Sequence, residues 1–173
     1  MTTATPSPAL DLPALRVPAS SVRFGRAEDA AELAALSRPF VRSGALRERP
    51  VPLYAARAAD FVVAVGPGGA IEGCVGLSVY PAGPAAGGVP AGVLYNFCVA
   101  GHRQGRGVGA VLLRTALTRA RTRSLGALFT ATTGGGRLFQ RYGFTPAAAR
   151  LAPRAWADSL DPRRDARILA RAV

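Results

Sequence analysis

The sequence contains no lysine, so all 22 of its basic residues are arginine. Against 10 acidic residues they give a formal net charge of +12. Clustered cations suit nucleic-acid backbones, but aromatic residues that would stack single-stranded bases are not interleaved with these arginines. The missing lysine, beside abundant alanine, glycine and proline, is typical of the coding bias of a GC-rich genome. We therefore do not expect nucleic acid as a partner, although a positive field would help to recruit a polyanionic cofactor or an acidic substrate.

Long apolar runs and cysteines are also scarce. No segment approaches the roughly 20 apolar residues of a membrane span, and the first residues have neither the basic start nor the apolar run of a signal peptide. We expect a disordered leader over residues 1–20, one domain over 21–173, and a cytoplasmic protein without a membrane or metal partner. Cys74 and Cys98 each lie in an apolar run, which favours buried, reduced thiols over a disulfide or metal ligands.

A glycine-rich segment, QGRGVG from Gln104 to Gly109, joins an apolar strand pattern to an amphipathic helix pattern. Glycines at 105, 107 and 109 let the backbone approach a ligand closely. The first amides of the following helix have no intrahelical acceptor, and the helix dipole adds to their attraction for an anion. The segment lacks the Lys-Ser/Thr ending of a P-loop, which argues against a nucleotide triphosphatase. It therefore predicts a pyrophosphate-binding site.

Hydrophobic periodicity and turn residues predict a mixed α/β domain. Strands are expected over 21–24, 60–65, 71–80, 92–99, 125–132 and 167–173, and helices over 27–36, 39–43, 108–123 and 136–141. The helix over 108–123 joins two parallel strands in a βαβ crossover. Its outward arginines, expected on a solvated face, are Arg114, Arg119, Arg121 and Arg123. The result is a mixed central sheet with helices on both faces.

These features resemble the GCN5-related N-acetyltransferase (GNAT) superfamily. Its acetyl-CoA motif reads Gln or Arg, two residues, Gly, one residue, then Gly or Ala, and Gln104, Gly107 and Gly109 match it. The stretch Leu138–Phe144 is similar to the family's closing helix and Gly-Phe turn. The resemblance implies the GNAT fold, of the α/β (α+β) class, with splayed fourth and fifth strands that admit acetyl-CoA. The cofactor contacts that it implies come from Phe97, Cys98, Val99, Gln104, Gly105, Arg106, Gly107, Val108, Gly109 and Ala110.

The resemblance also implies a chemistry, from which two common side chains are missing. Val93–Asn96 stand where many relatives carry a glutamate base, and Phe139 stands where they carry a tyrosine acid. As catalytic candidates, Asn96 could order a water that receives the proton of the amine, and Thr132 could donate a hydrogen bond to the departing thiolate. The alternatives are strand packing or hydrogen bonding for Asn96 and a capped strand end for Thr132. His102, in the turn beside the phosphate site, is expected to be an exposed loop residue, with a catalytic role as the alternative. Glu72 at the hairpin is expected to be solvated.

A narrower resemblance is to the acetyltransferase domain of bacterial N-acetylglutamate synthase. The matching segments are Ser37–Phe40, Gly44–Arg49, Thr132–Thr133, Leu138–Pro146 and Pro162–Leu169. In that family arginines clamp the carboxylates of glutamate, which implies substrate-binding roles for Arg49 and Arg164, with Arg38 and Arg47 as further matches. A planar guanidinium suits a bidentate grip on a carboxylate. Ala166 departs from the serine that the family usually has near the substrate.

From these resemblances we expect direct acetyl transfer from acetyl-CoA to the amine of a small amino acid, L-glutamate first, as in arginine biosynthesis. Two alternatives stay open. One is a transferase of the same fold that acts on a protein amine or an aminoacyl-RNA. The other is a regulatory module that binds acetyl-CoA without turnover. A homodimer is compatible with the sequence.

Overall fold

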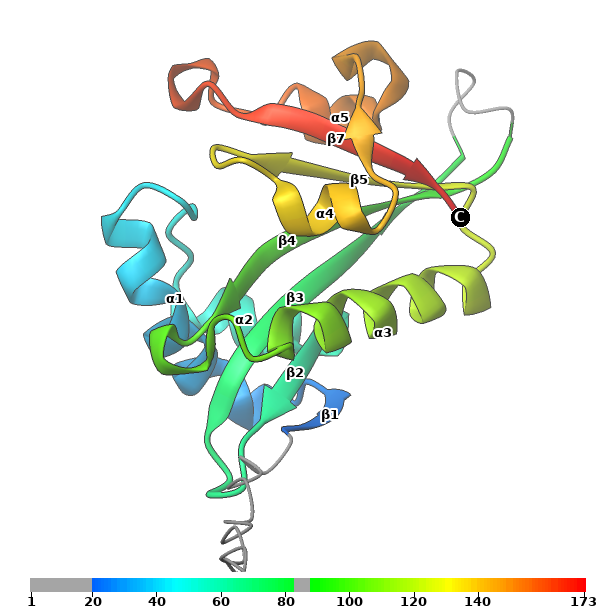
Figure 1. The fold of residues 1–173 in the computed structure, drawn as a ribbon. Helices are drawn as coiled ribbons and strands as arrows, with labels where there is room; N and C mark the ends of the chain where they lie inside the picture. The colour runs from blue at the N-terminus through cyan, green and yellow to red at the C-terminus, as the bar shows by residue number, and fades with distance from the viewer. Residues whose placement is uncertain (1–19, 83–87) are drawn as a thin grey trace, which may run out of the picture.

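The computed structural model of the chain describes residues 20–82 and 88–173, so the expected leader lies outside the described residues except for Ser20. One seven-stranded sheet with strand order β1-β2-β3-β4-β5-β7-β6 forms the centre (Figure 1). Neighbouring strands are antiparallel except β4 and β5, which are parallel. In chain order the elements are β1 (Ser21–Phe24), α1 (Ala30–Arg42), α2 (Val51–Ala56), β2 (Phe61–Val65), β3 (Ile71–Tyr80), β4 (Ala91–Val99), α3 (Val108–Thr122), β5 (Ala127–Thr132), α4 (Arg137–Arg141), β6 (Thr145–Pro146), α5 (Arg154–Ala157) and β7 (Arg167–Ala172).

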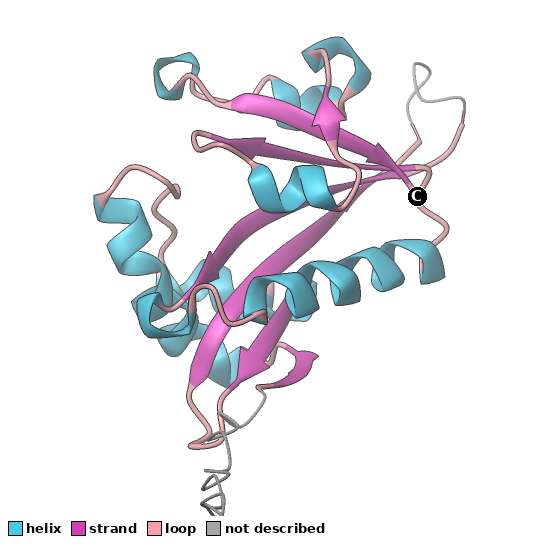
Figure 2. Ribbon diagram, in the orientation of Figure 1, coloured by secondary structure: helices cyan, strands magenta, loops and turns pink. Residues whose placement is uncertain are grey.

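Helices cover both faces of this sheet (Figure 2). On one face, α3 and α4 bury apolar side chains such as Leu112, Leu113 and Phe139 against the strands. On the other face, α1 and α2 pack Leu33 and Tyr54 against β2 and β3. The expected mixed α/β architecture with two covered faces is confirmed. Two layers of apolar contacts therefore fix the position of β4, which lies in the middle of the sheet.

Strands β4 and β5 start side by side and then diverge (Figure 1). Their pairing runs from Ala91 opposite Ala127 to Leu94 opposite Thr130, where the Thr130 hydroxyl donates a hydrogen bond to the Leu94 carbonyl at 3.2 Å. Beyond this pair, the edge of β4 that faces β5 has no strand partner among the residues that the structure describes. The sheet therefore opens a V-shaped gap, which confirms the splayed fourth and fifth strands.

A β-bulge in β4 lies at the start of this gap. The register of β3 against β4 shifts between Cys74 and Gly76, and Asn96 adopts a left-handed φ of 50°. Because the bulge interrupts the alternation of side chains, Tyr95 and Asn96 both contact residues on the α1 and α2 side. The bulge thus concentrates polar side chains of β4 on one face where the strands separate.

The first helical segment was predicted incorrectly. Instead of helices over 27–36 and 39–43, a short 3-10 turn at Ala27–Asp29 leads into one helix, α1, which continues through Pro39. Packing of Phe40 against the α1-side core accompanies this continuation, although Pro39 lacks an amide hydrogen. The sequence analysis also missed α2, which has only six residues and a proline in its first turn. These errors matter because the segment between α1 and α2 carries Arg47 and Arg49.

One arginine of α3 is not on a solvated face. The Arg119 guanidinium lies 4.6 Å from the centre of the Phe24 ring and donates hydrogen bonds to the carbonyls of Asp60 and Ala59 at 3.2 and 2.6 Å. Arg119 therefore ties α3 to β1 and to the start of β2. The other three arginines of this set are exposed as expected.

Candidate active site

The glycine turn, residues 104–110, presents backbone to open space at the start of α3. Gly105 and Gly107 have φ values of 72° and 85°, which residues other than glycine rarely adopt. A Cβ at either position would have no neighbouring atom within 4 Å. No side chain caps α3, and the first amide with an intrahelical acceptor is that of Val111, bonded to the Gly107 carbonyl at 3.1 Å. The amides of residues 108–110 are therefore oriented for an anionic ligand, and the turn fits a pyrophosphate group.

Gln104 and Gly109 of the motif also have structural roles. The Gln104 side-chain amide donates to the Val99 carbonyl at 3.0 Å and so joins the turn to the end of β4. A Cβ at Gly109 would lie 3.1 Å from Leu138 and 3.3 Å from Phe97. Gly109 thus lets α3 approach β4 and α4 closely, and its contribution to a ligand would come from its amide.

Glu72 is buried, which corrects the expectation of a solvated side chain. Its carboxylate lies 2.9 Å from Arg103 Nε and accepts a hydrogen bond from the Ser20 hydroxyl at 2.7 Å. Arg103 also donates to that hydroxyl at 2.9 Å. This ion pair anchors the residues just before the glycine turn to β3. His102 stays exposed, as expected, with Nε2 4.0 Å from the same carboxylate.

Past the bulge, β4 offers backbone rather than side chains to the gap. The Phe97 ring packs 5.4 Å from the Phe139 ring, which in turn lies 5.5 Å from Phe144. Cys98 is buried on the opposite face, with its sulfur 3.7 Å from that of Cys74, and both thiols are free. The hydrogen bond between the two thiols and burial raise the pKa of Cys74. The segment that should hold the cofactor therefore has its side chains committed to packing.

Asn96 uses its side-chain amide within the protein. Its oxygen accepts hydrogen bonds from Arg49 at 3.1 Å and from the Tyr54 hydroxyl at 3.2 Å. Its nitrogen donates to the Ser37 hydroxyl at 2.8 Å and contacts the Cys74 sulfur at 3.6 Å. These contacts occupy the donors and acceptors of the amide. The contacts of Asn96 agree with the hydrogen-bonding alternative, in which its side chain holds Arg49, and the water-ordering role stays a prediction.

Three arginines from two distant segments meet where β4 and β5 separate. Arg49 also donates to the Arg47 carbonyl at 3.2 Å, Arg47 to the Ser159 carbonyl at 3.1 Å, and Arg164 to the Gly44 carbonyl at 2.7 Å. Within residues 20–82 and 88–173, none of the three forms an ion pair with a carboxylate. Desolvation lowers the pKa of Arg49, and the charges of Arg47 and Arg164 lower it further.

These arginines line a cavity of about 90 Å³, which we call the arginine cavity. Its walls are Ala45, Leu46, Arg47, Arg49, Leu94, Tyr95, Asn96, Ala131, Thr133, Leu160, Asp161, Arg164 and Ala166. The structure brings Arg49 and Arg164 together in this lining, with Arg47, one of the two further matches, beside them. Arg38 lies exposed on α1 and takes no part in the lining.

The end of β5 directs neighbouring threonines to different faces. Thr133 lines the arginine cavity, whereas Thr132 lies on the α4 side, where its methyl group would be 3.4 Å from a Cβ at Gly136. The Thr132 oxygen accepts a hydrogen bond from the Gly134 amide at 3.2 Å, which leaves its hydroxyl hydrogen available to an acceptor in the gap. The sequence analysis gave Thr133 no role of its own, although Thr132–Thr133 was among the segments that match N-acetylglutamate synthase.

The family follows from a comparison with known sequences. Residues 57–146 match the model of the acetyltransferase (GNAT) domain. The chain belongs to the GNAT acetyltransferase family. This segment contains β2 to β6 and hence the glycine turn and both splayed strands. No curated protein sequence matches the chain.

Several solved structures have a similar fold. N-acetylglutamate synthase from Neisseria gonorrhoeae, in complex with coenzyme A and N-acetyl-glutamate, is similar with a TM-score of 0.78 and 25% identity over 88% of this chain and 35% of that one. Rv2747 from Mycobacterium tuberculosis, also with CoA, has a TM-score of 0.71 and 19% identity over 88% of this chain and 99% of that one. YhbS, a GNAT family N-acetyltransferase from Escherichia coli in complex with CoA, has a TM-score of 0.63 and 18% identity over 98% of this chain and 85% of that one.

This chain spans about a third of the length of the gonococcal synthase. The shared fold therefore does not show that this chain has the activity of that whole enzyme. Among the described residues, no helix has the length and apolar character needed to cross a bilayer. The family assignment makes the domain an acetyltransferase with acetyl-CoA as donor.

Proposed function

We propose that the protein acetylates the amine of a small amino acid that carries carboxylates, with L-glutamate as the first candidate and arginine biosynthesis as the corresponding process. The observation that carries this proposal is the arginine cavity, where three guanidinium groups without a carboxylate partner among the described residues face the gap between β4 and β5. Guanidinium groups bind carboxylates through paired, charge-assisted hydrogen bonds. The likeness to the gonococcal synthase, solved with N-acetyl-glutamate, supports the same acceptor.

In this proposal the backbone supplies most of the donor site. The amides of residues 108–110 would hold the pyrophosphate, and the unpaired edge of Phe97–Val99 would hold the arm and the thioester oxygen. Acetyl-CoA supplies the activated acetyl group. Thr132 would donate its hydroxyl hydrogen toward the departing sulfur from the α4 side of the gap. Arg49 and Arg164 would hold the acceptor's carboxylates.

The residues that line the arginine cavity provide a poor general base. Asp161 is the carboxylate in the lining, and hydrogen bonds from Arg163 lower its pKa. A carboxylate with a lowered pKa takes up a proton weakly at neutral pH. We infer that the amine loses its proton to solvent, helped by three positive charges that disfavour an ammonium ion in this cavity.

The test is release of free thiol from acetyl-CoA in the presence of each of the twenty amino acids, with the product confirmed by mass. Arg164→Gln should raise the KM for the acceptor by at least about tenfold, because it removes a charged hydrogen-bond donor. Arg121→Gln is the matched control, since Arg121 is an exposed arginine of α3 outside the lining of the arginine cavity. Tight acetyl-CoA binding without release for any amino acid would instead favour a macromolecular acceptor or a regulatory module.

A further inference from the structure

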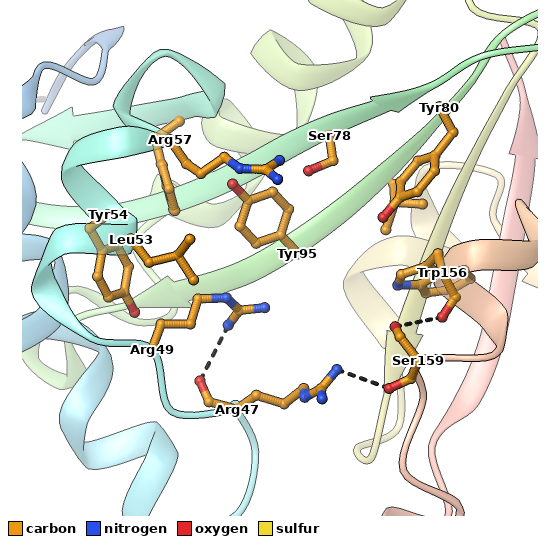
Figure 3. Close-up of a pocket in the computed structure, with 12 residues that line it drawn as sticks. Arg47, Arg49, Leu53, Tyr54, Arg57, Ser78, Tyr80, Tyr95, Trp156 and Ser159 are labelled. Atoms are coloured by element: carbon orange, nitrogen blue, oxygen red, sulfur yellow. Dashed lines mark hydrogen bonds between the residues drawn. The ribbon is translucent and has the colours of Figure 1, made fainter.

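A second and larger cavity, which we call the aromatic cavity, adjoins the arginine cavity (Figure 3). It has a volume of about 200 Å³ and shares Arg47, Arg49 and Tyr95 with its neighbour. Tyr95 forms one wall, and Tyr80 and Trp156 form the wall across the space (Figure 3). Trp156 is supported from behind by Phe129, with ring centres 6.4 Å apart. The proposed acceptor chemistry makes no use of this space.

The polar groups of the aromatic cavity are mainly cationic. Arg49 and Arg57 extend into the space from the side of Tyr95, whereas Arg47 crosses it and its guanidinium reaches Ser159 beside Trp156 (Figure 3). Arg49 lies 5.1 Å from the centre of the Tyr95 ring, which holds it at the boundary between the two cavities. None of the described residues in the lining carries a carboxylate.

One carboxylate lies behind the wall. Asp60 accepts hydrogen bonds from the Tyr95 hydroxyl at 3.1 Å and from Ser78 at 3.5 Å, and lies 3.6 Å from Arg57. It therefore balances one of the three cationic charges and fixes the plane of the Tyr95 ring. An excess of positive charge remains between aromatic walls, which favours an anionic ligand.

The size of the cavity restricts that ligand. At about 30 Å³ for each water molecule, a volume of about 200 Å³ corresponds to six or seven waters, which is room for one six-membered ring with a small substituent. Aromatic rings stack on or against one another in offset or edge-to-face arrangements, and Arg groups grip a planar carboxylate in a paired geometry. We propose that the aromatic cavity is a second small-molecule site, which binds a planar aromatic carboxylate with its ring between Tyr95 and Trp156 and its carboxylate on the arginines.

Binding there also affects the neighbouring cavity. Arg49 lines both cavities and has one guanidinium to share. A carboxylate that draws Arg49 toward the aromatic cavity weakens its hold on an acceptor in the arginine cavity. Only this competition rests on the function proposed above, because occupancy of the aromatic cavity does not require turnover.

Trp156 makes the site directly observable, because it is the only tryptophan in the chain and lies in the wall. We would titrate the intact protein with benzoate and follow tryptophan fluorescence. Benzoate should cause a saturable change. Cyclohexanecarboxylate, with the same charge but no aromatic face, should bind at least about threefold more weakly, and benzamide, with the ring but no charge, at least about tenfold more weakly.

Variants separate this site from nonspecific binding. Arg57→Gln and Tyr80→Leu should each weaken benzoate binding at least about fivefold, whereas Arg154→Gln should not, because Arg154 is 94% exposed beside Trp156 and outside the lining. Thermal melting shows whether each variant is folded, and the two cavity variants act through different contacts. The absence of a saturable change, or equal binding by all three variants, would overturn the proposal.

Activity then distinguishes the two proposals. If glutamate is acetylated, benzoate should raise the KM for glutamate without changing kcat. Acetylation of glutamate with no fluorescence response would overturn the second site and leave the proposed function standing. A saturable response without acetylation of any amino acid would leave the second site standing and overturn the proposed function.

Discussion

The glycine turn and the arginine cavity lie on either side of the gap between β4 and β5, and the chain builds them in opposite ways. The turn consists of consecutive residues and exposes backbone amides at the start of α3. The arginine cavity consists of side chains from four distant segments: the stretch before α2, β4, the end of β5 and the loop before β7. The first region depends on backbone conformation, and the second depends on how the whole domain folds.

This difference bears on how each region responds to substitution. A turn made of backbone tolerates variation in the side chains around it, provided that its glycines remain. A cavity made of arginines can change its ligand by exchange of a single side chain. We therefore expect substitutions in the two regions to have separable effects, on acetyl-CoA for the turn and on the acceptor for the cavity.

The largest effect should come from Gly107→Val. Gly107 has a φ of 85° and opens onto the space where the pyrophosphate would lie, so a branched side chain both strains the turn and obstructs the ligand. Loss of two charge-assisted amide contacts corresponds to a rise of about 100-fold in the Kd for acetyl-CoA. Isothermal titration calorimetry measures this change.

Gly69→Val is the matched control for this variant. Gly69 has a φ of 86°, also faces open space, and lies in the hairpin between β2 and β3. It should lose a similar amount of stability and keep its affinity for acetyl-CoA. Equal losses of affinity in the two variants would show that strain, and not obstruction of the ligand, causes the effect.

The sequence predicted the glycine turn more completely than the arginine cavity. The reason is that the turn consists of consecutive residues, whereas the cavity consists of side chains from distant segments. Gln104, Gly107 and Gly109 follow a local spacing, so the residue pattern alone was enough to locate the turn, the strand that precedes it and α3. Glu72 and Arg103 form their ion pair only after β3 and the turn are brought together, and no spacing in the sequence signals it. The left-handed Asn96 and its link to Arg49 depend on a bulge between two strands, which hydrophobic periodicity does not reveal.

Arg49→Lys should give the next largest effect, on the side of the acceptor. A lysine keeps the charge but loses the paired geometry of the guanidinium and its link to Asn96. We expect the KM for the acceptor to rise about tenfold with the Kd for acetyl-CoA unchanged. Arg38→Lys is the control, because Arg38 lies exposed on α1 outside both cavities. A change in acetyl-CoA affinity in Arg49→Lys would contradict the separation of the two regions.

Glu72→Gln tests whether the ion pair behind the turn positions it. Glutamine keeps the size of the side chain but leaves Arg103 without its buried counter-charge. We expect the KM for acetyl-CoA to rise about fivefold at unchanged kcat, together with a lower melting temperature. Glu28→Gln, at a side chain that is 73% exposed, should change neither constant. A fall in kcat at constant KM would mean that Glu72 acts on the reaction and not on the placement of the turn.

The smallest effect, and the sharpest comparison, should come from two buried neighbours whose polar atoms lie 3.9 Å apart, Cys98 and Ser37. Cys98 is on the strand that should hold acetyl-CoA, but its side chain points away from the gap, so Cys98→Ala should cost about 1 kcal/mol of stability and leave the Kd for acetyl-CoA within about twofold. Ser37 accepts the hydrogen bond of Asn96, which holds Arg49. Ser37→Ala should therefore leave the Kd for acetyl-CoA unchanged and raise the KM for the acceptor about threefold, because Asn96 loses a buried partner. Suppose that Cys98→Ala instead raised the Kd for acetyl-CoA while Ser37→Ala left the KM for the acceptor unchanged. The division into a donor site built from backbone and an acceptor site built from side chains would then be wrong.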